Sequence, residues 1–130
     1  MIRRMRRGGE SGQDLIEFAL ILPLLLLLLL GIMEFGVAVF TYNTVANAAR
    51  EGARYGIIHP ADDAAIEAAT RMLTTGLDQG ELDIAVARPG ADTIQVDVTY
   101  VHHFMTTPFI VALGGDGTLT MHTVSTMNIE

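Results

Sequence analysis

The hydrophobic positions of the chain are concentrated in one run near its N-terminus. Residues 18–40 contain a single charged residue, Glu34, and include seven consecutive leucines, Leu24 to Leu30. A helix of these 23 residues is about 34 Å long, enough to cross the hydrocarbon core of a bilayer. The run is apolar on every helical face, whereas a core helix of a small soluble protein keeps a polar face. The pattern therefore predicts a transmembrane span over residues 18–40.

The helix is expected to continue beyond the span and to cover residues 13–56. Ala48, Gly52 and Gly56 recur every four residues along it and form a strip of small side chains that allows close approach of another backbone. We expect Gly52 to pack against the chain's own head rather than against another subunit. Gly56 has the alternative role of a helix stop, because Pro60 follows closely.

Residues 57–130 have the pattern of a small α+β head. A second helix is predicted from Pro60, with acidic residues in its first turn and Gly76 as its cap. Alternating apolar residues then predict a hairpin over residues 82–100 with a type II turn at Arg88–Ala91, and a third strand at residues 119–129. The predicted fold class is thus α+β, a lollipop in which a long N-terminal helix extends into a small head with one packing helix and a three-stranded antiparallel sheet.

Charge predicts the orientation of the span. Four arginines precede it and two follow it within a short distance, so the N-terminus should stay cytoplasmic and the head should be exported. The net charge is −7, and residues 41–130 carry eleven acidic residues against four arginines. An acidic head argues against nucleic acid and anionic lipid headgroups as partners. No cysteine is present, which excludes disulfides and thiol sites.

Candidate catalytic and metal-binding residues do not form a recognisable constellation. His102 and His103 are adjacent in a predicted strand and point to opposite faces, so they cannot share a metal without distortion. His59 and His122 have no partner at a suitable spacing, and Asp116 lacks the alternating ligands of a calcium loop. The sequence predicts neither an enzyme nor a cofactor or metal site.

The N-terminal residues resemble a prepilin processing site. Residues 1–12 form a short basic leader that ends in Gly12, and Glu17 follows five residues later, where the apolar run begins. The longer segment GQDLIEFALILPLLLLLLLGIMEFG, with NAAREGARYG after it, resembles the TadE-like family, minor pseudopilins of tight-adherence (Flp, type IVc) pilus systems. The resemblance implies cleavage after Gly12 by a prepilin-type peptidase and makes Gln13 the mature N-terminus.

Three further residues of the helix are candidates for roles in assembly. Glu17 could neutralise the new amine of Gln13, which in pilins usually belongs to a neighbouring subunit, or it could be an ordinary acid of a first helical turn. Pro23 can kink the span. Glu34 is either an intramembrane contact to a partner or an acid that reaches water at the outer boundary.

The resemblance implies a minor pseudopilin, a membrane-anchored assembly component of a tight-adherence pilus or a related secretion machine. Its implied partners are the peptidase, other pilins and pseudopilins, the inner-membrane assembly platform and the lipid bilayer. The expected location is the bacterial inner membrane, single-pass, with inclusion in the pilus left open. Two alternatives remain: a small domain secreted after cleavage by signal peptidase behind Ala48, and a single-span envelope protein with a binding head.

Overall fold

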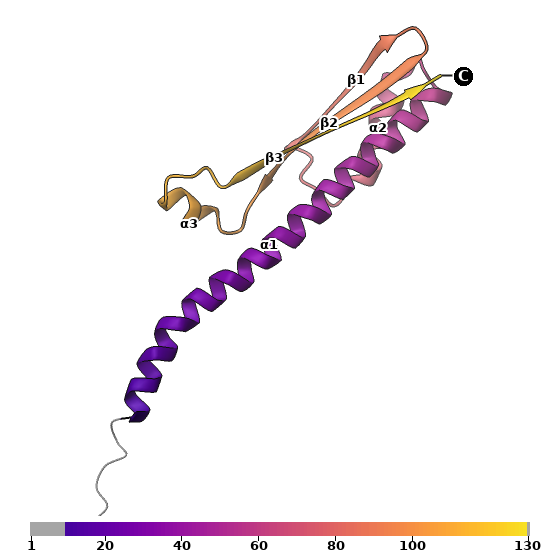
Figure 1. Ribbon diagram of the computed structural model, residues 1–130. Coiled ribbons are helices and arrows are strands. Elements are labelled where there is room, and N and C mark those ends of the chain that lie inside the picture. The colour runs from indigo at the N-terminus through magenta and orange to yellow at the C-terminus, as the bar shows by residue number, and fades with distance from the viewer. Residues whose placement is uncertain (1–9, 130) are drawn as a thin grey trace, which may run out of the picture. The chain divides into compact units, whose positions relative to one another are not determined.

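Residues 10–129 are described by the computed structural model (Figure 1). Three helices and three strands follow one another in this part of the chain: α1 Glu10–Ile58, α2 Asp63–Leu73, β1 Leu82–Gly90, β2 Thr93–His103, α3 Thr107–Ala112 and β3 Thr118–Asn128. The chain divides into two compact units, one up to Phe35 and one from Gly36 onward, so α1 contributes to both. Most of the predicted leader, residues 1–9 with its four arginines, lies outside the described residues.

Helix α1 is longer at both ends than the sequence predicted. It includes Gly12 near its start and continues without a break through Pro23. The alternative prediction that Gly56 ends the helix is wrong, since α1 runs to Ile58 and the His59 amide donates to the Tyr55 carbonyl at 3.1 Å. A glycine costs only about 1 kcal/mol inside a helix, which a long apolar helix or tight packing can offset.

The sheet belongs to the second unit and has the strand order β1-β2-β3, with both pairs antiparallel. Its central strand buries Ile94, Val96 and Val98 completely on one face, while the residues between them are partly exposed on the other. This alternation is the period of two that a one-sided antiparallel sheet requires. The predicted α+β class with a three-stranded antiparallel sheet is confirmed.

The hairpin turn lies further along the chain than predicted. Strand β1 continues to Gly90, which pairs with Thr93, and the register shifts between Ala87 and Gly90. An irregularity at the end of an edge strand accommodates Pro89, which has no amide hydrogen to donate to the ladder. The expected type II turn at residues 88–91 is therefore wrong, and the chain reverses at residues 91–92.

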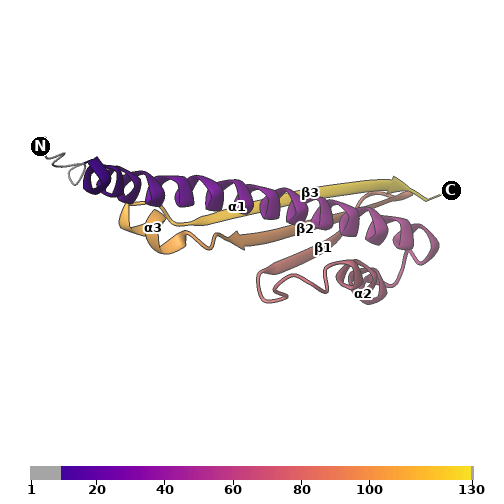
Figure 2. The same ribbon diagram turned by 90° about the horizontal axis from the view of Figure 1, so that it is seen from below.

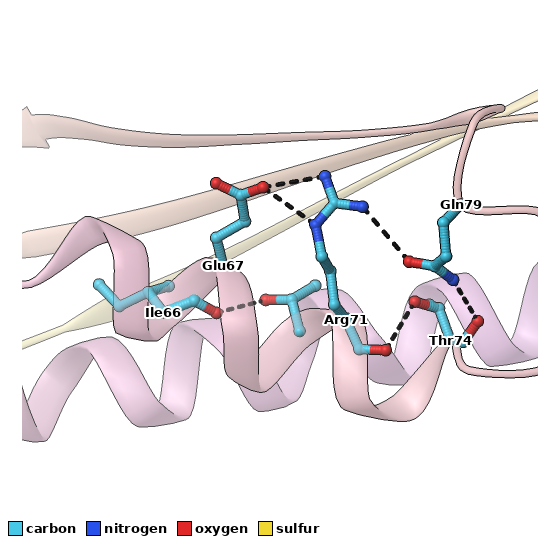
Figure 3. A network of polar contacts seen from close by, with 6 residues as sticks. Ile66, Glu67, Arg71, Thr74 and Gln79 are labelled. Carbon is cyan, nitrogen blue, oxygen red and sulfur yellow. Dashed lines mark hydrogen bonds and ion pairs between the residues drawn. The ribbon is translucent and has the colours of Figure 1, made fainter.

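Helix α2 is held at both ends by side chains. Asp62 accepts a hydrogen bond from the Ala65 amide at 3.0 Å, and the helix ends at Leu73 rather than near the predicted cap Gly76. The helix can end there because a polar network beyond its last turn satisfies carbonyls that would otherwise lack a partner. Arg71 joins Glu67 at 2.9 Å to Gln79 at 3.3 Å, and Gln79 donates to the Thr74 carbonyl at 2.7 Å (Figure 3).

The core of the second unit lies between the sheet and the part of α1 that starts at Gly36 (Figure 2). Buried positions recur on α1 at intervals that place them on one helical face. They are Ala38, Thr41, Val45, Ala46, Ala48, Ala49, Gly52, Ala53 and Gly56. Ile66 of α2 joins the same core and is fully buried.

Candidate functional site on the long helix

The predicted processing residues lie on the first turns of α1. Gly12, Gln13 and Glu17 are all exposed, and a Cβ added to Gly12 would meet no other atom within 4 Å. Gln13 and Glu17 are four residues apart and therefore lie on the same helical face, one turn from each other. A carboxylate at this position can approach an amine on residue 13 of its own chain or of a neighbour.

The leucine run is bare of protein cover. Leu24 is 71 % exposed, and most of the large apolar side chains from Leu15 to Met33 are exposed as well. Among the described residues, α1 is a helix long and apolar enough to cross a membrane, and none of its most apolar stretch is buried inside the chain. An apolar surface of this extent requires a cover other than water, which a lipid bilayer supplies.

Glu34 differs from its neighbours in exposure. Its side chain is 8 % exposed, whereas Met33 and Phe35 on either side are exposed. A carboxylate buried to this degree is not solvated as an acid at a water boundary would be. Both roles expected for Glu34, a partner contact within the membrane and an acid at its outer boundary, stay predictions.

The strip of small residues faces the core of the second unit. A Cβ on Gly52 would lie 2.1 Å from Thr70 Oγ1, and a Cβ on Gly56 would lie 2.8 Å from Ile94 Cγ2. Both distances are shorter than side-chain carbons tolerate, so neither position can accept a larger residue without a shift of its neighbours. Ala48 of the same strip is fully buried in the helix face that packs on the sheet.

Ion pairs lie on exposed parts of the second unit. On α1, Arg54 and Glu51 form an ion pair at 2.7 Å, and the hydrogen bond from Arg54 holds the pKa of Glu51 below its ordinary value. Arg88 of β1 donates to the Asp63 carboxylate at the start of α2, and this hydrogen bond lowers the pKa of Asp63. Arg88 also donates to the Pro60 carbonyl. The second pair joins segments that are far apart in the sequence.

Two histidines acquire partners that their spacing in the sequence did not reveal. His122 Nε2 lies 2.7 Å from Asp97 Oδ1, and His103 Nε2 lies 3.4 Å from Glu81 Oε1. The expectation that His122 lacks a partner is therefore wrong, because the register between β2 and β3 was not available from the sequence. No group of three or more His, Cys, Asp or Glu side chains in residues 10–129 could hold a metal ion.

The comparison with protein families centres on the same helix. The model of the TadE-like protein family matches residues 12–54. Residues 12–54 are a TadE-like segment. This segment contains Gly12, Gln13, Glu17, Pro23, Glu34, Ala48 and Gly52, and it stops just before Gly56. No curated protein and no solved structure matches the chain.

The match covers 43 of the 130 residues of the chain. The matched residues lie entirely within α1, so α2 and the sheet are outside the match. The resemblance to this family that the sequence predicted is confirmed over that segment. The comparisons therefore give no information about the arrangement of α2 and the sheet.

Proposed function

We propose that the chain is a minor pseudopilin, a membrane-anchored assembly component of a tight-adherence (Flp) pilus or of a related secretion machine. Its span lies in the bacterial inner membrane with the N-terminus in the cytoplasm and the head on the outer side. It joins other pilins and pseudopilins through the span and engages the inner-membrane assembly platform. It performs no chemistry of its own and needs no cofactor.

The observation that carries this proposal is the coincidence of the TadE-like segment with an apolar helix that the rest of the described chain leaves bare. Apolar surface is not kept exposed to water, so this helix must be covered by lipid or by the spans of partners. Single-pass anchoring and assembly through the span account for the same surface.

Processing gives the N-terminus a second role. A prepilin-type peptidase removes residues 1–12 and leaves a positively charged amine on Gln13. Glu17, one turn away on the same face, then neutralises this amine on a neighbouring subunit near the membrane boundary, where an unpaired charge is costly. This pairing fixes the axial position of one subunit against the next.

The alternative of a secreted domain conflicts with the packing of α1. Cleavage behind Ala48 would cut inside the helix and remove Val45, which is fully buried in the core of the second unit. Ala38 and Thr41, also buried, would be lost with it. A free head would therefore expose part of its own core.

The decisive experiment is the mature N-terminus, measured by mass spectrometry of protein extracted from membranes. We expect a start at Gln13 when the peptidase is present and the untrimmed mass in Gly12→Leu. Gly9→Leu, a glycine change inside the leader, serves as the matched control and should be trimmed normally. A start at Ala49 would establish secretion instead, and trimming of Gly12→Leu would remove Gly12 as the cleavage residue.

A further inference from the structure

The connection between β2 and β3 carries an unusual surface. We call residues 104–115 the apolar connection; they contain α3 and no charged residue. Met105 is 78 % exposed and Leu113 is 90 % exposed, and Phe109 and Val111 between them are exposed too. Four large apolar side chains within nine residues form a patch of the kind that marks a contact with protein or lipid.

The backbone of the apolar connection is bonded to itself. The Ile110 amide donates to the Thr106 carbonyl at 3.1 Å, and the Gly115 amide donates to the Ile110 carbonyl at 2.9 Å. The Thr107 hydroxyl donates across the base of the connection to the Gly117 carbonyl at 2.9 Å. These bonds satisfy some of the backbone polar groups of the connection, which lowers the cost of placing it near lipid.

The position of the apolar connection along α1 follows from the packing of the second unit. Gly52 lies against Val96 and Gly56 lies against Ile94, so β2 runs antiparallel to α1. Four helical residues advance about 6 Å and two strand residues advance about 6.6 Å, so the two segments stay in step. Extended along β2, this register places Phe104, the first residue of the connection, near the level of Gly36.

Independent observations agree with this register. Ala38 is buried and belongs to the core cluster against which Phe104 packs. Figure 1 shows α3 beyond the ends of β2 and β3, at the end of the sheet away from the C-terminus. Ala38 lies inside the predicted span 18–40, and Tyr42, an exposed aromatic residue of the type found at membrane boundaries, follows shortly after.

We propose that the apolar connection dips into the outer leaflet of the bilayer next to the span and forms a second lipid contact. The inference rests on the membrane anchoring proposed above and adds a lipid-binding surface to the head. Lipid is the occupant because the connection begins at the level where the bare span ends, and because it carries no charge that would resist insertion. The connection itself carries no charged residue, so its insertion does not require an anionic headgroup.

Two contacts with the bilayer restrict the head more than one. A head attached only through α1 could tilt and rotate about the axis of the helix. Insertion of Met105, Phe109 and Leu113 fixes the side of α1 on which the head tilts toward the membrane surface.

The absence of native cysteine makes a site-specific test direct. Met105→Cys and Leu113→Cys, each in the full chain, are labelled with an environment-sensitive fluorophore and reconstituted into phosphatidylcholine vesicles. Met72→Cys is the matched control, because Met72 on α2 is 77 % exposed and Met105 is 78 % exposed. Leu28→Cys in the leucine run reports on anchoring itself. Each label is probed with nitroxide-labelled lipid and with iodide on both sides of the bilayer.

We expect labels at residues 105 and 113 to shift to the blue, to lose fluorescence with nitroxide lipid and to resist iodide, whereas the label at residue 72 behaves in the opposite way. Iodide quenching at 105 and 113 equal to that at 72, with Leu28 quenched by lipid, overturns this inference and leaves the anchoring intact. Protection from both quenchers shows that protein covers the connection and also overturns it. A Leu28 label that lipid does not quench overturns the anchoring and this inference together.

Discussion

Gly52 of α1 and Thr70 of α2 approach each other so closely that no side chain fits between them. A Cβ on Gly52 would lie 2.1 Å from Thr70 Oγ1 and 3.2 Å from Val96 Cγ1. The Thr70 hydroxyl is buried and donates to the Ile66 carbonyl at 2.8 Å, so it cannot turn away without leaving a buried polar group unpaired. The distance between α1 and α2 is therefore set by the missing side chain at residue 52.

We expect Gly52→Ala to lower the free energy of unfolding of the head by about 1–3 kcal/mol, the usual cost of overpacking a core. The gain in helix propensity, about 1 kcal/mol, opposes this loss without cancelling it. Gly36→Ala is the matched control on the same helix, since a Cβ there meets nothing within 4 Å. Chemical denaturation of detergent-solubilised protein measures both variants.

A double variant distinguishes the contact with Thr70 from a general effect of the substitution. Thr70→Ala removes the hydroxyl that the new methyl group would strike, so Gly52→Ala should cost less in that background than alone. Equal costs in the two backgrounds, or a Gly52→Ala variant as stable as Gly36→Ala, would show that the short distance is not what requires glycine.

The two residues also show what the sequence could and could not provide. The spacing of Ala48, Gly52 and Gly56 predicted a strip for close packing, because helical periodicity is a local property. That Thr70 opposes Gly52 follows from how α2 meets α1, which depends on contacts between distant segments. The turn at residues 91–92 escaped prediction for a related reason: Pro89-Gly90 is a strong local turn signal, and strand pairing overrode it.

The candidate site divides in the same way. The long apolar helix was predicted, because an unbroken apolar run is a strong signal. The burial of Glu34 was not, since a charged residue in an apolar run gives no indication of what lies beside it. The sequence gives no indication that the apolar connection is exposed either, because its exposure depends on how β2 and β3 are placed.

The ion pair between Asp63 and Arg88 predicts a dependence of stability on pH. The hydrogen bond from Arg88 is the largest cause of the lowered pKa of Asp63. A carboxyl whose pKa is lower in the folded state contributes stability above its unfolded pKa, and this contribution is lost as the pH falls through the folded value. The lost stabilisation should therefore appear below about pH 4, where an unperturbed aspartate begins to take up its proton.

Arg88→Gln tests this dependence. Its melting temperature should lie below that of the natural chain at neutral pH, and the difference should shrink as the pH falls below about 4. Part of the difference should persist, because Arg88 also donates to the Pro60 carbonyl and that bond does not depend on a charge. A difference that stays constant down to the most acidic condition at which the chain is folded would mean that the pair contributes nothing measurable.

Glu34 offers a test of partner contact within the membrane. Glu34→Gln keeps the shape and the hydrogen-bonding capacity of the side chain but removes its charge, so insertion should be preserved while crosslinking to other pilus components falls. Glu34→Lys should reduce crosslinking further, because it places the opposite charge at the same position. Met33→Gln, at the exposed neighbouring position, is the control for added polarity. Normal assembly of both Glu34 variants would leave no partner role for this residue.

Glu17 separates assembly from anchoring. In Glu17→Ala the amine of Gln13 on the neighbouring subunit loses its counter-charge near lipid, at a cost of a few kcal/mol at most because the position is close to the boundary. Removing an acid makes the helix more apolar, so insertion should be unaffected. We therefore expect the head to remain accessible to protease from the outer side while pilus formation drops.

The size of this drop decides between the two roles of Glu17. An acid that only favours the dipole of a first helical turn contributes about 0.3–1 kcal/mol, and its loss should be nearly silent. Asp14→Ala is the matched control, because Asp14 is another exposed acid of the same turns and lies one position after Gln13 rather than one helical turn from it. Pilus counts are compared in cells in which the variant is the sole copy. If Glu17→Ala and Asp14→Ala both assemble like the natural chain, the amine is not paired by Glu17, and the axial position of the subunits must be set by contacts elsewhere on α1.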